Sequence, residues 1–329
     1  MPRPPSPETP SQRRRRLVRA AEELARDSDG VLSRRQLRDL GLTAAQVRTE
    51  VRARRWRRHG RHTVAVHTGE LDQRAQWRSD LYEVGADAAL DGVTALIAAG
   101  LTGYDEELTH VSVSKGSRPR RPEGVEVHET RRRTPGDVMG AGIPRTRAAV
   151  ATLRGALWER SDRQAALIVV LAVQQRLTAG AAVRDGLDGV QRHERRGFLR
   201  LIARDVVDGA QALGELDFAR FCREWGLPEP ERQKVRRGRR GRVYLDVFWA
   251  GSRLVVEIEG IHHGSGETQI ADALRQNAIS IRRDTVLRIP LLGLRVAPDE
   301  FMAQVAEALA VAPPRDRPPC DRPPRRPAA

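Results

Sequence analysis

The chain has 329 residues, about twice the usual length of one domain, and this length favours two or three domains. It is 40% hydrophobic and 31% charged, and no apolar run approaches the ~20 residues of a membrane span, so we expect a soluble, cytoplasmic protein without a membrane partner. The net charge of +15 favours a polyanionic partner such as nucleic acid. Only two of the 58 basic residues are lysines, however, so a compositional bias toward arginine also explains the charge.

Proline and glycine positions divide the chain into segments of different pattern. Residues 1–16 and 311–329 are rich in Pro and Arg and bury little apolar surface, so we expect a disordered basic arm and a disordered tail. Breaks near Gly69, Gly142 and Gly209 predict the boundaries between the folded parts of the chain. The expected parts are a small module over 17–68, an α/β middle domain over 69–152, a helical connector over 153–210 and a larger α/β domain over 211–310.

Two helix-start signals lie close together in the first module. Ser33 and Gln36 form a capping-box pattern, and the run 43–46 repeats it just after Gly41, which ends the first helix. Val47 and Val51 then give the second helix one apolar face. The alternating run 62–66 follows as a strand that suits a wing. This order of elements predicts a winged helix-turn-helix.

The polar face of the second helix and the basic stretch after it carry residue types that contact DNA. In such a motif the second helix enters the major groove, where Arg and Gln read base edges while neighbouring arginines bind phosphates. The alternatives are a small helical module with a solvated charged face, or a basic surface that serves electrostatic adhesion alone. We favour DNA binding, with these candidate residues: Gln46, Arg48, Thr49, Arg52, Arg57 and Arg58.

Residues 31–66 resemble the N-terminal winged helix of AbiEi-family antitoxins, the antitoxin component of type IV toxin–antitoxin systems. The alternating runs 109–113 and 124–128 indicate two strands of a small sheet, and the segment they belong to, which includes Gly142–Thr146, resembles the second part of that family. The resemblance implies a DNA-binding autorepressor with a toxin or operon partner, in which the middle domain regulates or contacts that partner.

The last domain shows a regular succession of helix and strand patterns. The residues 254–256 form an apolar run typical of a central strand, and the others alternate or follow helical spacing. The predicted order is αβββαβα. Its elements are a helix over 213–225, strands over 233–236, 242–249 and 254–256, a helix over 269–281, a strand over 285–289 and a helix over 298–309.

Two carboxylates on neighbouring strands of this sheet predict a site for a divalent cation. Asp246 and Glu257 are eleven residues apart, and two facing strands bring such a pair close enough to share Mg²⁺ or Mn²⁺, which prefer hard oxygen ligands. Glu215 on the first helix is placed to orient the ion through water, and His262 or His263 to relay a proton, with His263 favoured. The alternative is that the acids mark solvated strand ends, but a carboxylate directly after an apolar run is costly to bury without a cation.

The segments that carry these acids resemble the uncharacterised relatives of very-short-patch-repair endonuclease. The resemblance runs through 245–246, 254–263, 272–277 and 286–288, about 100 residues with their motifs in order. It implies a PD-(D/E)XK fold, in which Asp246 and Glu257 are the metal-binding acids and Glu215 is the acid of the first helix.

One position departs from the superfamily pattern. Glu259, a further candidate catalytic residue, stands where the superfamily has its catalytic lysine, and no lysine follows Lys234. Arg275 or a histidine would therefore have to supply the positive charge of that lysine. Arg275 is also a candidate for DNA contact. Two hypotheses therefore remain. One is a Mg²⁺-dependent DNA endonuclease or nickase, and the other is a non-catalytic regulator that retains a vestigial nuclease fold.

Overall fold

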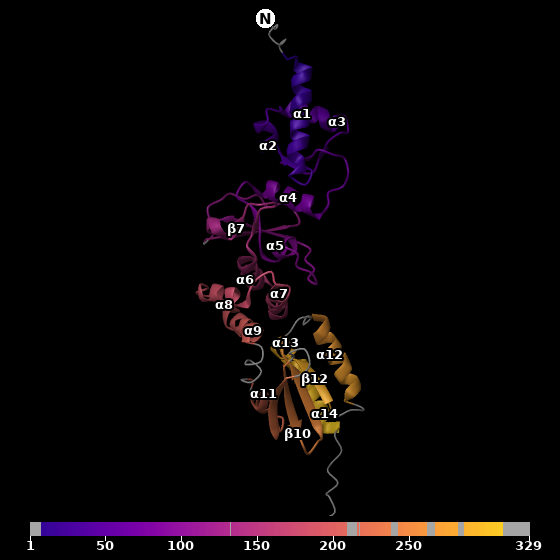
Figure 1. The fold of residues 1–329 in the computed structure, drawn as a ribbon, viewed down its shortest axis with the longest axis vertical. Helices are drawn as coiled ribbons and strands as arrows, with labels where there is room; N and C mark the ends of the chain where they lie inside the picture. Colours follow the sequence, from indigo (N-terminus) through magenta and orange to yellow (C-terminus); the bar gives the residue numbers. More distant parts are fainter. Residues whose placement is uncertain are drawn as a thin grey trace, which may run out of the picture. The chain divides into compact units, whose positions relative to one another are not determined.

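The computed structural model describes residues 8–131, 133–208, 216, 218–237, 243–261, 267–281 and 286–311 (Figure 1). The fold is mixed α/β, with 13 α-helices and three small sheets in this part of the chain. The chain divides into two compact units: Met1–Glu159 with Gln175–Gln191, and Arg160–Gln174 with Arg192–Ala329. None of the described helices combines the length and apolar character needed to cross a bilayer.

The first unit begins with three helices and a small antiparallel sheet of strand order β1-β3-β2. Thr9, Ser33 and Thr43 start α1, α2 and α3 with complete capping boxes, so the two helix starts expected at 33 and 43 are present. Trp56 is fully buried in the core between these elements. The elements are α1 (Pro10–Arg26), β1 (Val31–Ser33), α2 (Arg34–Asp39), α3 (Ala44–Arg52), β2 (Arg57–Arg58) and β3 (Thr63–Ala65).

The expectation of disorder over 1–16 is wrong for residues 10–16, which form the first turns of α1. Gln12 completes the capping box of Thr9, and Leu17 and Ala21 on the same helix are buried in the core. Arg14 adds a long-range ion pair to Glu50 on α3. Local arginine content therefore misled the prediction, because tertiary packing of one face stabilises this helix.

The second part of the first unit is built on a mixed five-stranded sheet of order β6-β5-β4-β8-β7. The runs expected as strands at 109–113 and 124–128 form β5 and β6, which pair in parallel. Helix α4 ends at Val84, before Gly85 and strand β4. The elements are α4 (Gln73–Val84), β4 (Ala89–Leu90), α5 (Gly92–Ala98), β5 (Thr109–Ser114), β6 (Val125–Thr130), β7 (Val138–Met139), β8 (Arg145–Thr146), α6 (Ala148–Trp158) and α8 (Gly180–Asp188).

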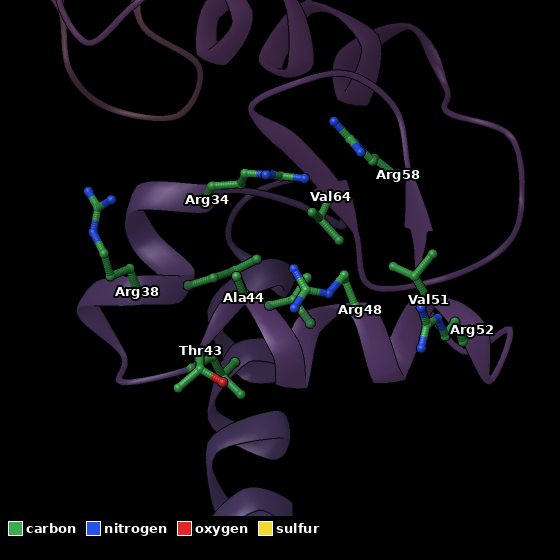
Figure 2. A pocket seen from close by; sticks show the side chains of 12 residues that line it. Arg34, Arg38, Thr43, Ala44, Arg48, Val51, Arg52, Arg58 and Val64 are labelled. Atoms are coloured by element: carbon green, nitrogen blue, oxygen red, sulfur yellow. The ribbon is translucent and has the colours of Figure 1, made fainter.

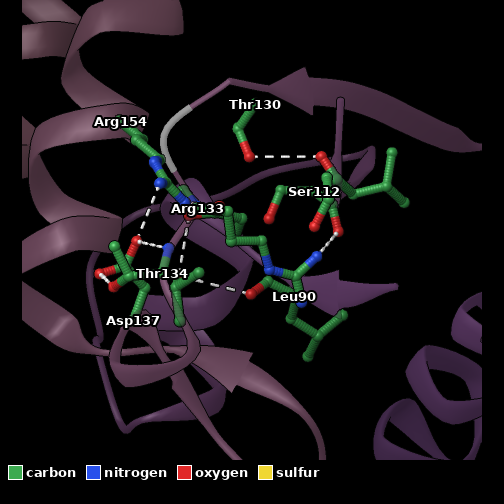
Figure 3. A network of polar contacts seen from close by, with 12 residues as sticks. Leu90, Ser112, Thr130, Arg133, Thr134, Asp137 and Arg154 are labelled. Atoms are coloured by element: carbon green, nitrogen blue, oxygen red, sulfur yellow. Dashed lines mark hydrogen bonds and ion pairs between the residues drawn. The ribbon is translucent and has the colours of Figure 1, made fainter. Parts of the chain in front are cut away.

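Close helix packing and a buried polar network fix this sheet. Gly92 has φ of 53°, and a Cβ there would lie 3.1 Å from Trp158, so only glycine fits where α5 meets α6. Asp91 is fully buried and accepts hydrogen bonds from Thr146 Oγ1 (2.8 Å) and Arg154 Nη1 (2.8 Å). Arg154 also reaches Asp137, and the guanidinium of Arg133 donates to the carbonyl of Ser112 (Figure 3). These contacts satisfy buried charges and give the region a structural role.

The helices expected as a connector over 153–210 are divided between the two units. Helices α6 and α8 belong to the first unit, whereas α7 (Asp162–Gln174) and α9 (Arg196–Asp208) belong to the second. Six consecutive residues of α7, 165–170, are buried, so this helix is a core element. Asp205 of α9 is fully buried and pairs with Arg295 Nε at 2.7 Å. These helices therefore complete the hydrophobic core of the second unit.

The second unit contains a four-stranded sheet of order β12-β11-β10-β9, in which only β11 and β12 are parallel. The αβββαβα order is present with one short helix added, α13 (Leu291–Val296), whose leucines are buried. The remaining elements are α11 (Phe218–Glu224), β9 (Arg232–Arg237), β10 (Val243–Trp249), β11 (Leu254–Glu259), α12 (Glu267–Ser280), β12 (Val286–Pro290) and α14 (Pro298–Val311).

Strand β11 is longer than the apolar run alone predicts. Leu254, Val256 and Ile258 are buried, while Val255, Glu257 and Glu259 on the opposite face are only half-buried. This alternation allows the strand to continue through both glutamates, because their side chains avoid the apolar side. The two acids therefore lie within a central strand and share one face of the sheet.

Candidate nucleic-acid interface and acidic site

Helix α3 presents a basic, polar face to solvent. Arg48, Thr49 and Arg52 are exposed, as the sequence predicts, and Thr49 Oγ1 donates a hydrogen bond to the Ala45 carbonyl oxygen at 3.0 Å. Residues at these positions are neighbours on one side of an α-helix. The exposed face of α3 is therefore suited to polyanion contact.

The inner side of α3 holds a buried carboxylate. Glu50 is only 2% exposed and accepts hydrogen bonds from Arg14 Nη2 at 2.5 Å and Arg55 Nε at 2.6 Å. Burial raises the pKa of Glu50, but the hydrogen bonds from Arg55 and Arg14 outweigh burial and leave the pKa below its ordinary value. The anionic Glu50 thus joins α1 to α3 and fixes the orientation of the basic face.

Gln46 completes the capping box of α3, as its sequence pattern predicts. Its amide oxygen accepts hydrogen bonds from the backbone N–H of Thr43 at 2.8 Å and from Thr43 Oγ1 at 3.1 Å. The side chain is half-buried. The capping box occupies the amide oxygen and leaves the two N–H donors of Nε2 for other partners, so base contact by Gln46 stays a prediction.

Arg57 and Arg58 lie on β2, and both are exposed. Arg58 Nε donates to the carbonyl oxygen of Gly60 at 2.9 Å, which directs this side chain along the β2–β3 turn. The two arginines therefore extend the basic surface from α3 to the small sheet.

A groove of about 620 Å³ lies between α2, α3 and the β2–β3 hairpin (Figure 2). Its apolar floor includes Val47, Val51 and Val64. Arginines from α2, α3 and β2 surround that floor. They are Arg34, Arg38, Arg48, Arg52 and Arg58. The concentration of guanidinium groups makes this the candidate nucleic-acid interface, because arginine binds phosphate and the polar edges of bases.

The acidic site lies on one face of the sheet of the second unit. Asp246 on β10 is the direct cross-strand partner of Glu257 on β11, so the predicted acids are brought together. Directly opposite side chains on paired strands share a face, with Cβ atoms ~4.5–5.5 Å apart. The two other strands contribute a cation each in the same row: Lys234 on β9 opposite Asp246, and Arg288 on β12 opposite Glu257.

Polar contacts hold the side chains and strands of the acidic site in place. Glu257 is 21% exposed at its side chain, and Arg288 Nε lies 3.3 Å from its Oε2 atom. Gln269 Nε2 donates to Glu259 Oε2 at 3.4 Å. The buried Asn277 of α12 donates to the backbone carbonyl of Arg288 and accepts from its N–H, each at 2.9 Å. Helix α12 therefore fixes the strand that carries Arg288.

The structure describes only some of the other predicted catalytic residues. Glu215, His262 and His263 lie outside the described residues, so the expectations for them stay predictions. Glu259 lies on the face of Asp246 and Glu257, opposite Tyr244. Arg275 is exposed on α12, and its Nη2 atom lies 3.2 Å from Asp272 Oδ1.

The carboxylate pair fits a hard divalent cation. Mg²⁺ retains several waters and is commonly held by only one or two carboxylates, so Asp246 and Glu257 suffice as protein ligands. Within the described ranges no group of three or more His, Cys, Asp and Glu side chains is arranged to hold a metal. The fit therefore rests on the cross-strand register of two oxygen donors, with Glu259 beside them on the same face.

Lys234 and Arg288 were missed as members of this row. Residues equally distant from the centre of a β-hairpin pair with one another, so the strand ends expected at 236 and 242 would pair Lys234 with Tyr244. The observed register pairs Arg237 with Val243 and therefore Lys234 with Asp246. Arg288 had no local signal, because β11 and β12 are parallel and are separated by helix α12.

No protein-family model matches the chain, and no curated protein is significantly similar to it.

Proposed function

We propose that this chain is a DNA-binding protein that hydrolyses phosphodiester bonds with the help of Mg²⁺ or Mn²⁺. The observation that carries the proposal is the register of Asp246 with Glu257 on the half-buried face of β10 and β11. The order of helices and strands around them and the strand order β12-β11-β10-β9 support a PD-(D/E)XK nuclease-like fold. In such a fold the two acids are the metal ligands.

The first three helices and their sheet support a winged helix as the DNA-binding part. The order α1-β1-α2-α3-β2-β3, with β3 between β1 and β2, supports the turn between β2 and β3 as the wing. Helix α3 would enter the major groove with Arg48, Thr49 and Arg52, and the wing would bind phosphates with Arg57 and Arg58. This is also the part that resembles the AbiEi-family antitoxins.

The residues of the acidic site suit metal-assisted hydrolysis of a phosphodiester. Asp246 and Glu257 would hold the cation, which would supply Lewis-acid stabilisation of the phosphodiester and a more acidic water. In hydrolysis the water oxygen bonds to phosphorus, and the bond to one ester oxygen breaks. Asp246 and Glu257 hold and orient the reactive centre, and Gln269 positions Glu259 beside them.

Cleavage of supercoiled plasmid tests the proposal. Purified full-length protein should nick the plasmid with Mg²⁺ or Mn²⁺ and not with EDTA. Asp246→Asn and Glu257→Gln should each lower the rate by at least about 100-fold, because each removes a metal ligand. Both variants keep the shape of the replaced side chain, and circular dichroism verifies that they fold.

A second candidate function is a non-catalytic autorepressor with a toxin or operon partner. The ion pair between Arg288 and Glu257 favours it, since a cation of the chain itself already neutralises one of the two acids. The same assay separates the candidates. Intact plasmid, together with salt-sensitive DNA binding that EDTA leaves unchanged, would contradict the nuclease and support the repressor.

A further inference from the structure

The acidic pair lies at the centre of a row of four charged residues. Lys234, Asp246, Glu257 and Arg288 are successive cross-strand partners in β9, β10, β11 and β12. Direct partners share a face of the sheet in every pairing. The row therefore reads cation, carboxylate, carboxylate, cation across the whole sheet.

The two cations of the row are held differently. Arg288 contacts Glu257 through Nε, and Asn277 fixes its backbone. Lys234 lies on β9, an edge strand of the described sheet, and its side chain is exposed. Its four-carbon stem is long enough to span the ~4.8 Å between neighbouring strands, so a phosphate held at Asp246 is within the reach of the ammonium group.

The position of Lys234 provides a positive charge beside the acidic pair, which Glu259 cannot provide. Phosphodiester hydrolysis places negative charge on the phosphate oxygens, and a nearby fixed cation stabilises the transition state. Glu259 contributes no cation to the face that it shares with Glu257. An ammonium group is a compact charge with three donors, which suits a non-bridging phosphate oxygen.

We propose that Lys234 is a catalytic residue whose ammonium group binds the non-bridging oxygens of the phosphate under attack. The inference rests on the proposed nuclease function. As the water oxygen bonds to phosphorus, the bond from phosphorus to the leaving ester oxygen breaks. The proton of the water passes to solvent, the leaving oxygen takes a proton from solvent, and Lys234 keeps its protons throughout.

The chain offers a matched control, because Lys115 is its only other lysine and is exposed in the first unit. In the full-length protein, Lys234→Met should lower the single-turnover nicking rate by about 100-fold. Lys234→Arg should recover part of the rate, and Lys115→Met should cut like the wild type. DNA affinity should change less than about threefold in all three, because one phosphate contact contributes little to total binding.

A labelling experiment gives a readout besides activity. In a Lys115→Arg background, Lys234 is the only side-chain amine, so mass spectrometry follows its reaction with an amine-specific reagent without interference. A saturating DNA duplex should slow this reaction at least about tenfold. An unchanged labelling rate at saturating DNA would overturn the proposed phosphate contact.

The outcomes separate the inference from the proposed function. If the wild type nicks plasmid, Asp246→Asn does not, and Lys234→Met cuts at the full rate, the nuclease stands and the role of Lys234 is overturned. If the wild type leaves plasmid intact with both metals, the nuclease and the role of Lys234 are overturned together.

Discussion

At the scale of single residues, buried ionisable groups determine how the proposed DNA-binding part is held together. Glu50 lies inside the module with its carboxylate between Arg14 and Arg55, which are partly exposed. A buried charge is stable only when it is paired and hydrogen-bonded. The capping box of Thr9 starts α1 at Pro10, and the pair with Arg14 joins this helix to α3.

Replacing Glu50 should destabilise the protein in a pH-dependent way. Glu50→Gln should lower the free energy of unfolding by about 1–3 kcal/mol at neutral pH, because one carboxylate oxygen becomes an NH₂ donor facing an arginine and the other oxygen loses its negative charge. The pKa of Glu50 is below its ordinary value of 4.5, so its stabilising contribution is present above that pH and disappears as the pH falls through the lowered value. Denaturant unfolding at pH 7 and at about pH 3.5 measures both effects. Glu23→Gln, at an exposed position, is the control. If the stability difference between Glu50→Gln and this control were as large in acid as at neutral pH, the prediction would be contradicted.

His128 should make the first unit sensitive to mild acid. Burial, and then the charge of His110 at a ring nitrogen distance of 3.0 Å, lower the pKa of His128 to about 4. Because the unfolded histidine takes up a proton near its ordinary value of 6.5, stability falls as the pH drops from about 6.5 to 4, by up to about 3 kcal/mol. His128→Phe keeps the stack on Trp158 and removes the titration. Unfolding curves with the same pH dependence in both proteins would contradict this account.

The residue-scale predictions from sequence succeeded where pairing is local. The turn after Trp249 is short, so the sequence placed Asp246 and Glu257 on facing strands, and the structure makes them direct partners. The capping box of Thr43 and Gln46 was predicted for the same reason, because its two members are three residues apart. Glu50 was not predicted to be buried, because one of its partners is 36 residues away.

At the scale of elements, the buried amide of Asn277 joins helix α12 to strand β12. Asn277 is 1% exposed and makes two hydrogen bonds to the backbone of Arg288, in the manner of a neighbouring strand. This interaction sets the position of the strand that forms one end of the charged row. The side chain therefore has a positioning role for the acidic site.

Asn277→Ala should loosen β12 and weaken the second unit. The loss of both hydrogen bonds should reduce the free energy of unfolding by about 2–4 kcal/mol, because buried backbone groups lose their partner. Hydrogen exchange in the peptide that contains β12 should speed up selectively. Gln276→Ala, at an exposed neighbouring position, serves as the control. Unchanged exchange in β12 would show that the amide does not hold the strand.

Elements with strong periodic patterns were predicted well, and short ones were not. The runs 109–113, 124–128, 242–249 and 285–289 correspond to strands within a few residues. Strand β1 and helix α13 were missed, since three and six residues are too few for a clear period. Helix α13 also directly follows β12, so its leucines continue the apolar run of the strand.

At the scale of the whole molecule, the chain passes between its two units three times, at Glu159, Gln174 and Gln191. The sequence indicated a connector over 153–210, because local helical patterns carry no information on which core they join. Buried ion pairs such as that of Asp205 with Arg295, 90 residues apart, assign α9 to the second unit. The proposed DNA-binding and catalytic parts therefore belong to different units of one chain.

The measurement that tests this division of labour most directly is the single-turnover cleavage of one plasmid by three proteins: the wild type, Arg48→Ala/Arg52→Ala, and Asp246→Asn/Glu257→Gln. The arginine variant should need more protein to reach half of the maximal rate and show a weaker dependence of affinity on salt, yet cut at the normal rate when saturating. The acid variant should bind with normal affinity and leave the plasmid intact. Metal-dependent cutting by the acid variant at the wild-type rate would contradict the account.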